Sequence, residues 1–422
     1  MSRPSPSFFR RIQWRLEYGV YLAAEKLIGL LTPREACLVG EQVGLLIRLL
    51  SAKHRRIVKR NLRIAFAGEK SVAELEALAE EGFRRAGANL IASLCTASLE
   101  PEALNRAVKI ENAELLTRAM STGKGVIGVL AHMGNWEALA QKFPQFMPPG
   151  VKAGDIYRPL SNPYLDVRMV ATRQRMGLKL FKKSVNPLAL ASFLRAGSAL
   201  GIVSDQRALG IGEIVPFFGR LTACTPLAAV LARRTGATVF GVSVTSQTPG
   251  KWRIKFHPLV GEPTTENCMR LLETVMRESP ADVFWLQDRW KVNKHKPQWE
   301  PGRNPKEGIA MLRANKPRRC LVWLEDGAHP VPSLKQAEPD NFIFEYCLPS
   351  DAPRPAWLAG DAIVHIRTVL NRCKLIAAEI NRVDQAAALP LDFVYTPHGS
   401  AEVIAVCRMM DMPVVAAPED NP

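Results

Sequence analysis

A histidine and a glutamate five positions apart are the residues in this sequence best suited to acid–base chemistry. His132 directly follows an apolar run, and Glu137 comes five residues later. On a continuous helix, that spacing turns the two side chains about 140° apart, so they would not face each other. They can meet if His132 lies in a loop and Glu137 lies in the first turn of the next helix. Asn135 is a suitable N-cap for such a helix.

In that arrangement, the carboxylate of Glu137 accepts a hydrogen bond from one ring nitrogen of His132. This bond would fix the tautomer and support the imidazolium as it forms. The other nitrogen is free to take a proton from an alcohol, whose oxygen then attacks an ester or thioester carbonyl. The pattern therefore predicts general-base acyl transfer, with His132 as base and Glu137 as its orienting partner. The spacing alone leaves open a structural histidine with no catalytic role.

Other common catalytic and cofactor motifs are missing from the sequence. It contains no G-x-S-x-G elbow, so a serine acyl-enzyme is not expected. It also contains no Walker P-loop and no G-x-G-x-x-G motif, so we expect no cofactor. None of the eight cysteines has C-x-x-C spacing. We therefore predict no metal site, and expect reduced, mostly buried thiols.

An α/β layered domain is predicted to position His132. The run 125–130, GVIGVL, is typical of a buried parallel strand, and a helix is expected over about 135–143. Alternating strands and helices predict one layered domain over residues 64–300. His132 then lies at the carboxyl end of the sheet, where ligands bind in such folds. Further strands are expected at 153–157, 178–181, 199–204, 238–245 and 252–256, and helices at 72–99, 111–120, 163–176, 187–196, 226–235 and 267–278.

A stretch rich in proline, glycine and lysine at 294–306 predicts a domain boundary. Residues 301–422 are expected to form a smaller α/β domain with strands at 320–324, 342–348, 391–395 and 413–417 and helices at 367–384 and 401–410. Its last part weakly resembles the donor-binding half of glycosyltransferases with two Rossmann-like lobes. His398 to Ser400 would begin a helix there, which suits a phosphate. A structural or partner-binding appendage is the alternative.

Residues 1–63 are predicted to form membrane-associated amphipathic helices. Residues 12–31 are about as many as a bilayer span needs, but they carry two acidic and two basic residues. Charges inside a span are costly, so an interfacial helix fits better. Residues 36–50 show a similar pattern. The alternative is that both are ordinary core helices.

A formal net charge of +16 favours an anionic partner. Seven basic residues between Arg48 and Arg63 follow the two apolar stretches, as expected beside an anionic cytoplasmic membrane surface. A solvated helix face would also explain them. Basic residues interleaved with aromatics on a recognisable module are missing from the sequence, so no nucleic acid partner is expected.

Six sequence blocks, in order, resemble the late acyltransferases of lipid A biosynthesis. These enzymes form the lauroyl/myristoyl branch of the lysophospholipid acyltransferase superfamily. The block AHMGNWE (131–137) resembles their H-x-G-N-W-E motif. The others are IYRPLSNPY (156–164), VSDQR (203–207), VPFFGRLTACTPLAAVL (215–231), RRTGA (233–237) and ADVFWLQDRWK (281–291). Gln287 and Asp288 depart from the basic or histidine residues of the last block, and residues 301–422 lie outside the pattern.

The resemblance implies transfer of a fatty acyl chain from an acyl carrier protein thioester to a hydroxyl of a lipid A-type glycolipid. The enzyme would lie on the cytoplasmic face of the inner membrane, either peripherally or with a single N-terminal anchor. Alternatives are another acceptor, such as a glycosylated or amino-acid lipid, and a membrane-bound scaffold with a degenerate site.

The resemblance also implies roles for individual residues. His132 and Glu137 would be the catalytic pair. Arg158 would hold a phosphate or sugar of the acceptor, with an ion pair to Asp155 as the alternative. The remaining residues implied to bind substrate are Asn135, Asp205 and Arg207. Asn135 would otherwise be only a helix cap, and the last two would otherwise bridge loops.

Overall fold

The computed structural model describes residues 7–208, 212–291, 316–325, 342–358, 360, 362–367, 373–397 and 399–416. These residues form a mixed α/β fold with two compact units, as expected of an α/β protein. The first unit comprises residues 1–54, 76–206 and 224–287 in the described part of the chain. The second comprises residues 55–75, 207–223 and the described residues from 288 onward.

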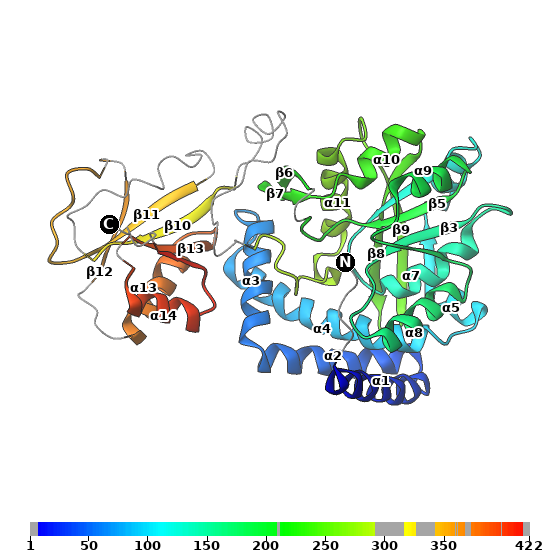
Figure 1. Ribbon diagram of the computed structural model, residues 1–422, viewed down its shortest axis with the longest axis horizontal. Helices are drawn as coiled ribbons and strands as arrows, with labels where there is room; N and C mark the ends of the chain where they lie inside the picture. Colours follow the sequence, from blue (N-terminus) through cyan, green and yellow to red (C-terminus); the bar gives the residue numbers. More distant parts are fainter. Residues whose placement is uncertain are drawn as a thin grey trace. The chain divides into compact units, whose positions relative to one another are not determined.

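The first unit is built on a seven-stranded sheet with strand order β1-β9-β8-β2-β5-β3-β4 (Figure 1). Only the β8–β9 pairing is antiparallel. Strand β2 has parallel neighbours on both sides, and all but its last residue are buried, which explains its unbroken apolar sequence. The strands are β1 (Val108–Glu111), β2 (Val126–Leu130), β3 (Ala153–Tyr157), β4 (Lys179–Lys182), β5 (Ala199–Val203), β8 (Thr238–Thr248) and β9 (Lys251–Pro258).

Helices pack around this sheet, and several begin at a residue suited to cap them. Asn135, Asn162 and Asn186 each accept a hydrogen bond from a backbone amide in the first turn of the helix that follows. These caps fix where the chain turns from each preceding loop into helix. The helices are α4 (Val72–Thr96), α5 (Pro101–Ala107), α6 (Ala113–Met120), α7 (Trp136–Lys142), α8 (Pro163–Gln174), α9 (Pro187–Arg195), α10 (Leu227–Thr235) and α11 (Thr265–Glu278).

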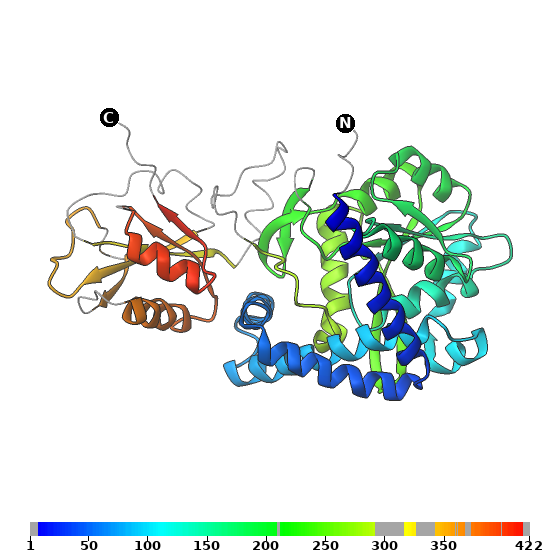
Figure 2. The ribbon, with the colours of Figure 1, turned by 60° about the horizontal axis from the view of Figure 1, so that its bottom comes forward.

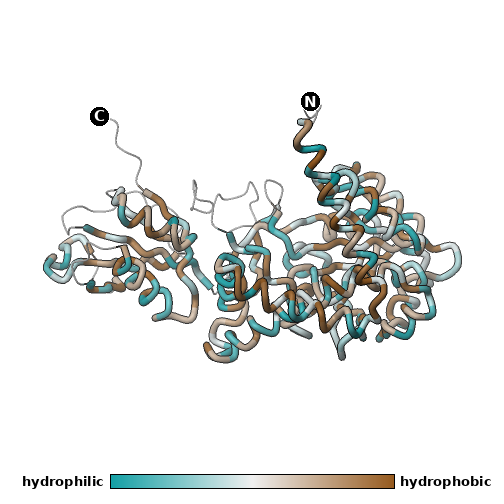
Figure 3. The backbone as a smooth tube through the Cα atoms, turned by 90° about the horizontal axis from the view of Figure 1, so that it is seen from below, coloured by the Kyte–Doolittle hydropathy of each residue, from teal (hydrophilic) through white to brown (hydrophobic). Residues whose placement is uncertain are grey.

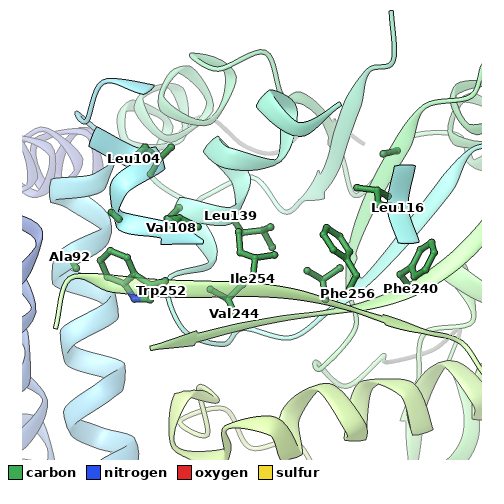
Figure 4. Close-up of a cluster of buried hydrophobic side chains, with 14 of the residues drawn as sticks. Ala92, Leu104, Val108, Leu116, Leu139, Phe240, Val244, Trp252, Ile254 and Phe256 are labelled. Carbon is green, nitrogen blue, oxygen red and sulfur yellow. The ribbon is translucent and has the colours of Figure 1, made fainter. Parts of the chain in front are cut away.

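The hydrophobic core on one side of the sheet joins β8 and β9 to the helices above them (Figure 4). Trp252, Ile254 and Phe256 alternate along β9, so their side chains point to the same face. The indole nitrogen of Trp252 donates to Asn89 Oδ1 at 2.7 Å, which ties this core to α4. Each of these three side chains is at most 2% exposed.

The first two helices, α1 (Phe8–Gly29) and α2 (Pro33–Leu50), differ in their packing. No residue of α1 is buried, and polar and apolar residues alternate along it (Figure 3). Helix α2 packs closely on α4, because a Cβ on Gly44 would lie 2.1 Å from the carbonyl oxygen of Phe83. Both segments are helical, as predicted. Among the described helices, none combines the length and hydrophobicity of a membrane span.

The second unit contains a five-stranded, all-parallel sheet with strand order β12-β11-β10-β13-β14. Helices α13 (Cys373–Gln385) and α14 (Ala401–Met409) cover the same face of this sheet (Figure 2). The order reverses between β10 and β13, as in doubly wound folds. The strands are β10 (Arg318–Trp323), β11 (Phe342–Pro349), β12 (Ile363–Arg367), β13 (Leu391–Thr396) and β14 (Val414–Ala416), and a separate hairpin pairs β6 (Glu213–Phe217) with β7 (Arg220–Cys224).

One buried carboxylate connects distant parts of the second unit. Asp392 on β13 is fully buried and lies 2.7 Å from Arg60, 2.9 Å from Arg220 and 3.3 Å from Arg318. Burial alone would raise the pKa of Asp392, but the three guanidinium groups outweigh it and hold the pKa below its usual value. Burial lowers the pKa of Arg220 to about 9.

The basic run before residue 64 therefore has a role inside the protein. Arg60 and Arg63 lie on α3 (Ala52–Phe66). Arg63 donates to Asp384 at 2.6 Å and to the carbonyl oxygens of Ala387 and Leu389, which follow α13. At these two positions, the prediction of a membrane-facing basic flank is wrong, because acidic side chains and free carbonyl groups of the second unit already bind the guanidinium groups.

The structure differs at a few positions from the helices and strands predicted from the sequence. The strands β1, β6, β7 and β12 were not predicted, and Arg367 ends a strand rather than beginning a helix. The unit boundaries differ from those expected at 64 and 301, because residues 55–75 and 207–223 group with the C-terminal residues. His398 lies outside the described residues. The eight cysteines are free, and seven are buried, as expected.

Candidate active site

The parallel register between β2 and β5 brings His132 next to Asp205. Leu130 pairs with Val203, and the amide of Ser204 donates to the carbonyl oxygen of Leu130 at 2.8 Å. His132 and Asp205 each lie two residues beyond this pair. Both therefore project from the carboxyl edge of the sheet at the same level, where α/β proteins commonly bind ligands.

The carboxylate of Asp205 binds His132 at two places. Its two oxygens lie 2.9 and 3.1 Å from Nδ1 of the imidazole, and Oδ2 accepts the backbone amide of His132 at 3.0 Å. The side chain of Asp205 is 7% exposed, and that of His132 is 23% exposed. An ionised carboxylate can only accept, so the proton lies on Nδ1 and the lone pair on Nε2.

The pKa of His132 lies above its ordinary value of 6.5. Burial by itself lowers this pKa, but the hydrogen bond and the negative charge of Asp205 outweigh it. Arg173 lowers the pKa and Glu137 raises it, both to a smaller extent. The imidazole is thus set up to accept a proton, because the adjacent carboxylate stabilises the resulting cation.

Glu137 does not make the hydrogen bond to His132 that the sequence predicted. Its carboxylate forms a two-point ion pair with Arg173 of α8, in which Arg173 Nε donates to Oε2 at 2.8 Å. Its Oε1 also accepts the indole N–H of Trp136 at 3.2 Å. Glu137 lies in the first turn of α7, as expected, but that turn faces α8. There the planar guanidinium of Arg173 binds both oxygens of the carboxylate.

Trp136 connects Glu137 with the histidine. The indole ring meets the imidazole of His132 edge to face, with centroids 5.3 Å apart, and Phe284 packs on its other side. Because Glu137 fixes the indole N–H, it restricts the ring that contacts His132. Glu137 therefore contacts the same indole that lies against His132.

A third carboxylate near this site, Asp155, was considered from the sequence only as a possible ion-pair partner of Arg158. Asp155 lies in β3 opposite Gly201 of β5, and Oδ1 accepts the amide of Ile156 at 2.7 Å. Burial raises the pKa of Asp155 to about 6, although the positive charge of Arg173 opposes the rise. Arg173 thus lies among acidic groups contributed by α7 and β3. Its position in an arginine-rich helix was the only sequence signal for it.

The other predicted site residues are placed differently. The side chain of Asn135 is 1% exposed and caps α7, and its amide nitrogen donates to Thr96 Oγ1 at 3.2 Å. The prediction that Asn135 binds substrate is therefore wrong, because the protein itself uses both ends of its amide. Arg158 is exposed just after β3. Arg207 belongs to the second unit and donates to the carbonyl oxygen of Lys291 at 2.9 Å.

Comparison with known families identifies the chain. The model of the bacterial lipid A biosynthesis acyltransferases matches residues 8–292, which is more than half of the sequence. The chain belongs to this family. It is therefore an acyltransferase, and the site around His132 and Asp205 lies within the matched region. The described residues from 316 onward lie outside the match.

Individual proteins similar to this chain are distant in sequence. The lipid A biosynthesis palmitoleoyltransferase of Escherichia coli (strain K12) is 24% identical over 265 residues, covering 61% of this chain and 85% of that protein. A lipid A biosynthesis acyltransferase of Shigella flexneri has the same identity and coverage. A phosphatidylinositol mannoside acyltransferase of Mycolicibacterium smegmatis is 24% identical over 197 residues, covering 44% of this chain and 64% of that protein.

Proposed function

We propose that this acyltransferase moves a fatty acyl chain from the thioester of an acyl carrier protein to a hydroxyl of a lipid A-type glycolipid, with His132 as the general base. One observation carries the proposal. Nδ1 of His132 is bound by Asp205 at 2.9 Å, which leaves Nε2 as the basic nitrogen beside the carboxyl edge of the sheet. The sequence suggested Glu137 as the orienting group, and the contacts support Asp205 instead.

The proposed reaction proceeds in two proton transfers. Nε2 takes the proton of the acceptor hydroxyl as its oxygen attacks the thioester carbonyl carbon, which gives a tetrahedral intermediate and an imidazolium. The intermediate then collapses, the carbon–sulfur bond breaks, and the imidazolium returns the proton to the leaving thiolate. Asp205 keeps Nδ1 protonated and offsets the positive charge throughout. The products are an ester and a free thiol, and no acyl-enzyme forms.

The acceptor class rests on the names of relatives and on charge. Two of the relatives are named for lipid A biosynthesis and one for a phosphatidylinositol mannoside, so all three names refer to glycolipids. The family match favours the lipid A-type acceptor. Arg158, exposed at the end of β3, is suited to a phosphate or sugar of the acceptor. A different glycosylated membrane lipid is the second candidate, favoured by the mannoside relative.

We further propose that α1 lies on the inner membrane at its cytoplasmic face. Apolar side chains on this helix are widely exposed, including Phe9 at 82%, Val20 at 72% and Leu27 at 66%. Tyr18 lies on the side of the helix that packs on α8, where it stacks on Tyr164, and this packing leaves the apolar side exposed. An interfacial helix buries such a face in the lipid and keeps its charged residues in water. An excess of basic residues in the whole chain would add attraction to anionic lipid and to an acidic carrier protein.

Acyl transfer by the full-length protein tests this function. Radiolabelled acyl carrier protein thioesters of several chain lengths would be incubated with a total inner-membrane lipid extract and the native protein, His132→Ala or Asp205→Asn. A labelled glycolipid with the native protein and almost none with His132→Ala is the expected result. Equal labelling by native protein and His132→Ala would remove His132 as the base. Labelling of a mannosylated inositol lipid but not of a lipid A precursor would favour the second acceptor.

A further inference from the structure

The backbone around His132 is held by a second segment of the first unit. The carbonyl oxygen of His132 accepts the amide of Phe284 at 2.8 Å, and Gly134 donates to the carbonyl oxygen of Asp282 at 2.9 Å. Between these bonds, Met133 and Val283 form an antiparallel bridge. Residues 132–134 and 282–284 thus pair like two short strands. Together with the bond to Asp205, this pairing uses both the amide and the carbonyl group of His132.

Gly134 also lies close to the backbone of β8. Its φ is +55°, and a Cβ there would lie 2.2 Å from the carbonyl oxygen of Val244 on β8. The loop is therefore confined between β8 on one side and residues 282–284 on the other. Its position depends on where Asp282 is held.

The side chain of Asp282 is buried and accepts several hydrogen bonds, although the residue lies in a segment that connects larger elements. The residue is 3% exposed and accepts from Arg85 Nη1 at 2.9 Å, Ser279 Oγ at 2.6 Å, and both the amide and hydroxyl of Ser246 at 2.9 and 2.6 Å. These donors come from α4, β8 and the residue that follows α11. One carboxylate therefore joins three elements, and its own peptide group binds the loop of His132.

We propose that the ion pair between Arg85 and Asp282 positions His132, so that these two residues set the rate of acyl transfer without touching substrate. The inference rests on the proposed role of His132 as base. Arg85 is itself fixed on α4 by Glu81, four residues earlier, at 2.8 Å. The carboxylate of Asp282 fixes its peptide, the peptide fixes Gly134, and Phe284 fixes the carbonyl group of His132. If the carboxylate is released, the imidazole moves relative to Asp205.

A positioning role makes predictions that a merely structural role does not. His132 acts in the proposed chemical step, so kcat should fall while KM changes little. The contact with Asp205 should also weaken, which lowers the pKa of His132 because burial then dominates. The other charged groups near His132, namely Arg173, Glu137 and Asp155, are retained in the variants.

The experiment uses full-length Asp282→Asn, Arg85→Met and Arg85→Lys, with Arg84→Met as the matched control. Arg84 precedes Arg85 on the same helix and pairs with Glu41 at 3.0 Å and with Glu81 at 3.8 Å, rather than with Asp282. We expect kcat to fall about 10- to 100-fold in Asp282→Asn and Arg85→Met, with KM within about twofold, since small misplacements of catalytic groups have effects of this size. Arg85→Lys should recover part of the loss, and Arg84→Met should behave as the native protein.

The pKa of the His132 imidazole, followed by its NMR signal, supplies a readout independent of turnover. His132→Ala identifies that signal. A lower pKa in folded Arg85→Met supports the proposal, and it does so even if Asp282→Asn fails to fold. An unchanged pKa with native kcat would overturn the proposal. A loss of activity that is fully explained by a smaller fraction of folded protein would also overturn it. Full activity of His132→Ala would instead overturn the proposed base, so the two failures are distinguishable.

Discussion

Asp205 binds both the backbone amide and the imidazole of His132, so a single carboxylate fixes the loop and the orientation of the ring. The two residues are 73 positions apart and meet because β2 and β5 are parallel neighbours in register. The arrangement separates two functions. Asp205 sets the protonation of His132, whereas Glu137 fixes the neighbouring Trp136 and Arg173.

Asp205→Asn should reduce kcat by about 10²- to 10⁴-fold, because an amide in this place no longer holds Nδ1–H or offsets the imidazolium. Initial rates with saturating donor and acceptor would measure the effect. Asp411→Asn is the control, since the pair that Asp411 forms with Arg56 is long, at 3.8 Å, and exposed. A rate for Asp205→Asn within threefold of the native rate would contradict the role of Asp205. A threefold change corresponds to about 0.7 kcal/mol in activation free energy.

The pH dependence of kcat/KM should show an acid limb with a midpoint above 6.5. The base must be neutral to accept a proton, and the pKa of His132 is raised, so activity grows as pH rises through that pKa. In Asp205→Asn the two largest interactions that raise this pKa are lost and burial remains, so the midpoint of any residual activity should move to lower pH. Rates over pH 5 to 9 at constant ionic strength would show this. A shift to higher pH would contradict the assignment.

Glu137→Gln should destabilise the protein by about 1–3 kcal/mol, because it leaves the charge of Arg173 with only Asp155 nearby in a partly buried place. The midpoint of the acid limb of kcat/KM should shift by no more than about half a pH unit, since Asp205, the main partner of His132, remains. Denaturant unfolding and the pH profile would measure the two effects. Glu137→Gln/Arg173→Met should recover part of the stability in a double-mutant cycle. A large acid-limb shift in Glu137→Gln would return the orienting role to Glu137.

Gly134→Ala should cost at least about 3 kcal/mol of unfolding free energy and abolish most activity. A side chain there is strained by the positive φ and also meets the carbonyl oxygen of Val244. Gly123→Ala is the matched control, because Gly123 has a φ of +73° but nothing within 4 Å of the added Cβ. That variant should lose only about 1–2 kcal/mol and retain activity. Equal losses in both variants would show that the close approach to β8 is unimportant.

Asp392→Asn should destabilise the second unit by about 3–5 kcal/mol, because three buried or nearly buried guanidinium groups share this carboxylate. Limited proteolysis of the chain from residue 316 onward would detect the change at temperatures where the native protein resists cleavage. Arg382→Met, which breaks an exposed pair with Glu379 on α13, should change little. Resistance equal to the native protein would mean that the network does not stabilise this unit.

The sequence predicted the parts of the site that depend on local pattern. The apolar run of β2 places His132 at the end of a buried strand, and the strand ending at Val203 places Asp205 on the same edge. Which carboxylate reaches the imidazole was predicted wrongly. The direction of Glu137 depends on Arg173, 36 residues away, and no local pattern records that contact.

The missed elements have similar causes. The β6–β7 hairpin turns at Phe218 and Gly219, both with positive φ, and a phenylalanine is an unusual residue for such a turn. The basic run containing Arg60 suggested a membrane surface, whereas its partner Asp392 is 332 positions later in the chain. Long-range pairing of this kind follows from the three-dimensional fold and not from spacing.

The shared carboxylate of Asp392 has a consequence for protein engineering. Arg60 and Arg220 lie inside the segment that matches the family, whereas Asp392 lies beyond it. Trimming the gene at codon 292 to obtain a minimal enzyme would remove the Asp392 carboxylate from both guanidinium groups. Arg60 would retain its pair with Asp288, whereas the buried Arg220 would lose the carboxylate that binds it. An expressed fragment meant to retain native behaviour should therefore extend through β14, or carry compensating substitutions at both arginines.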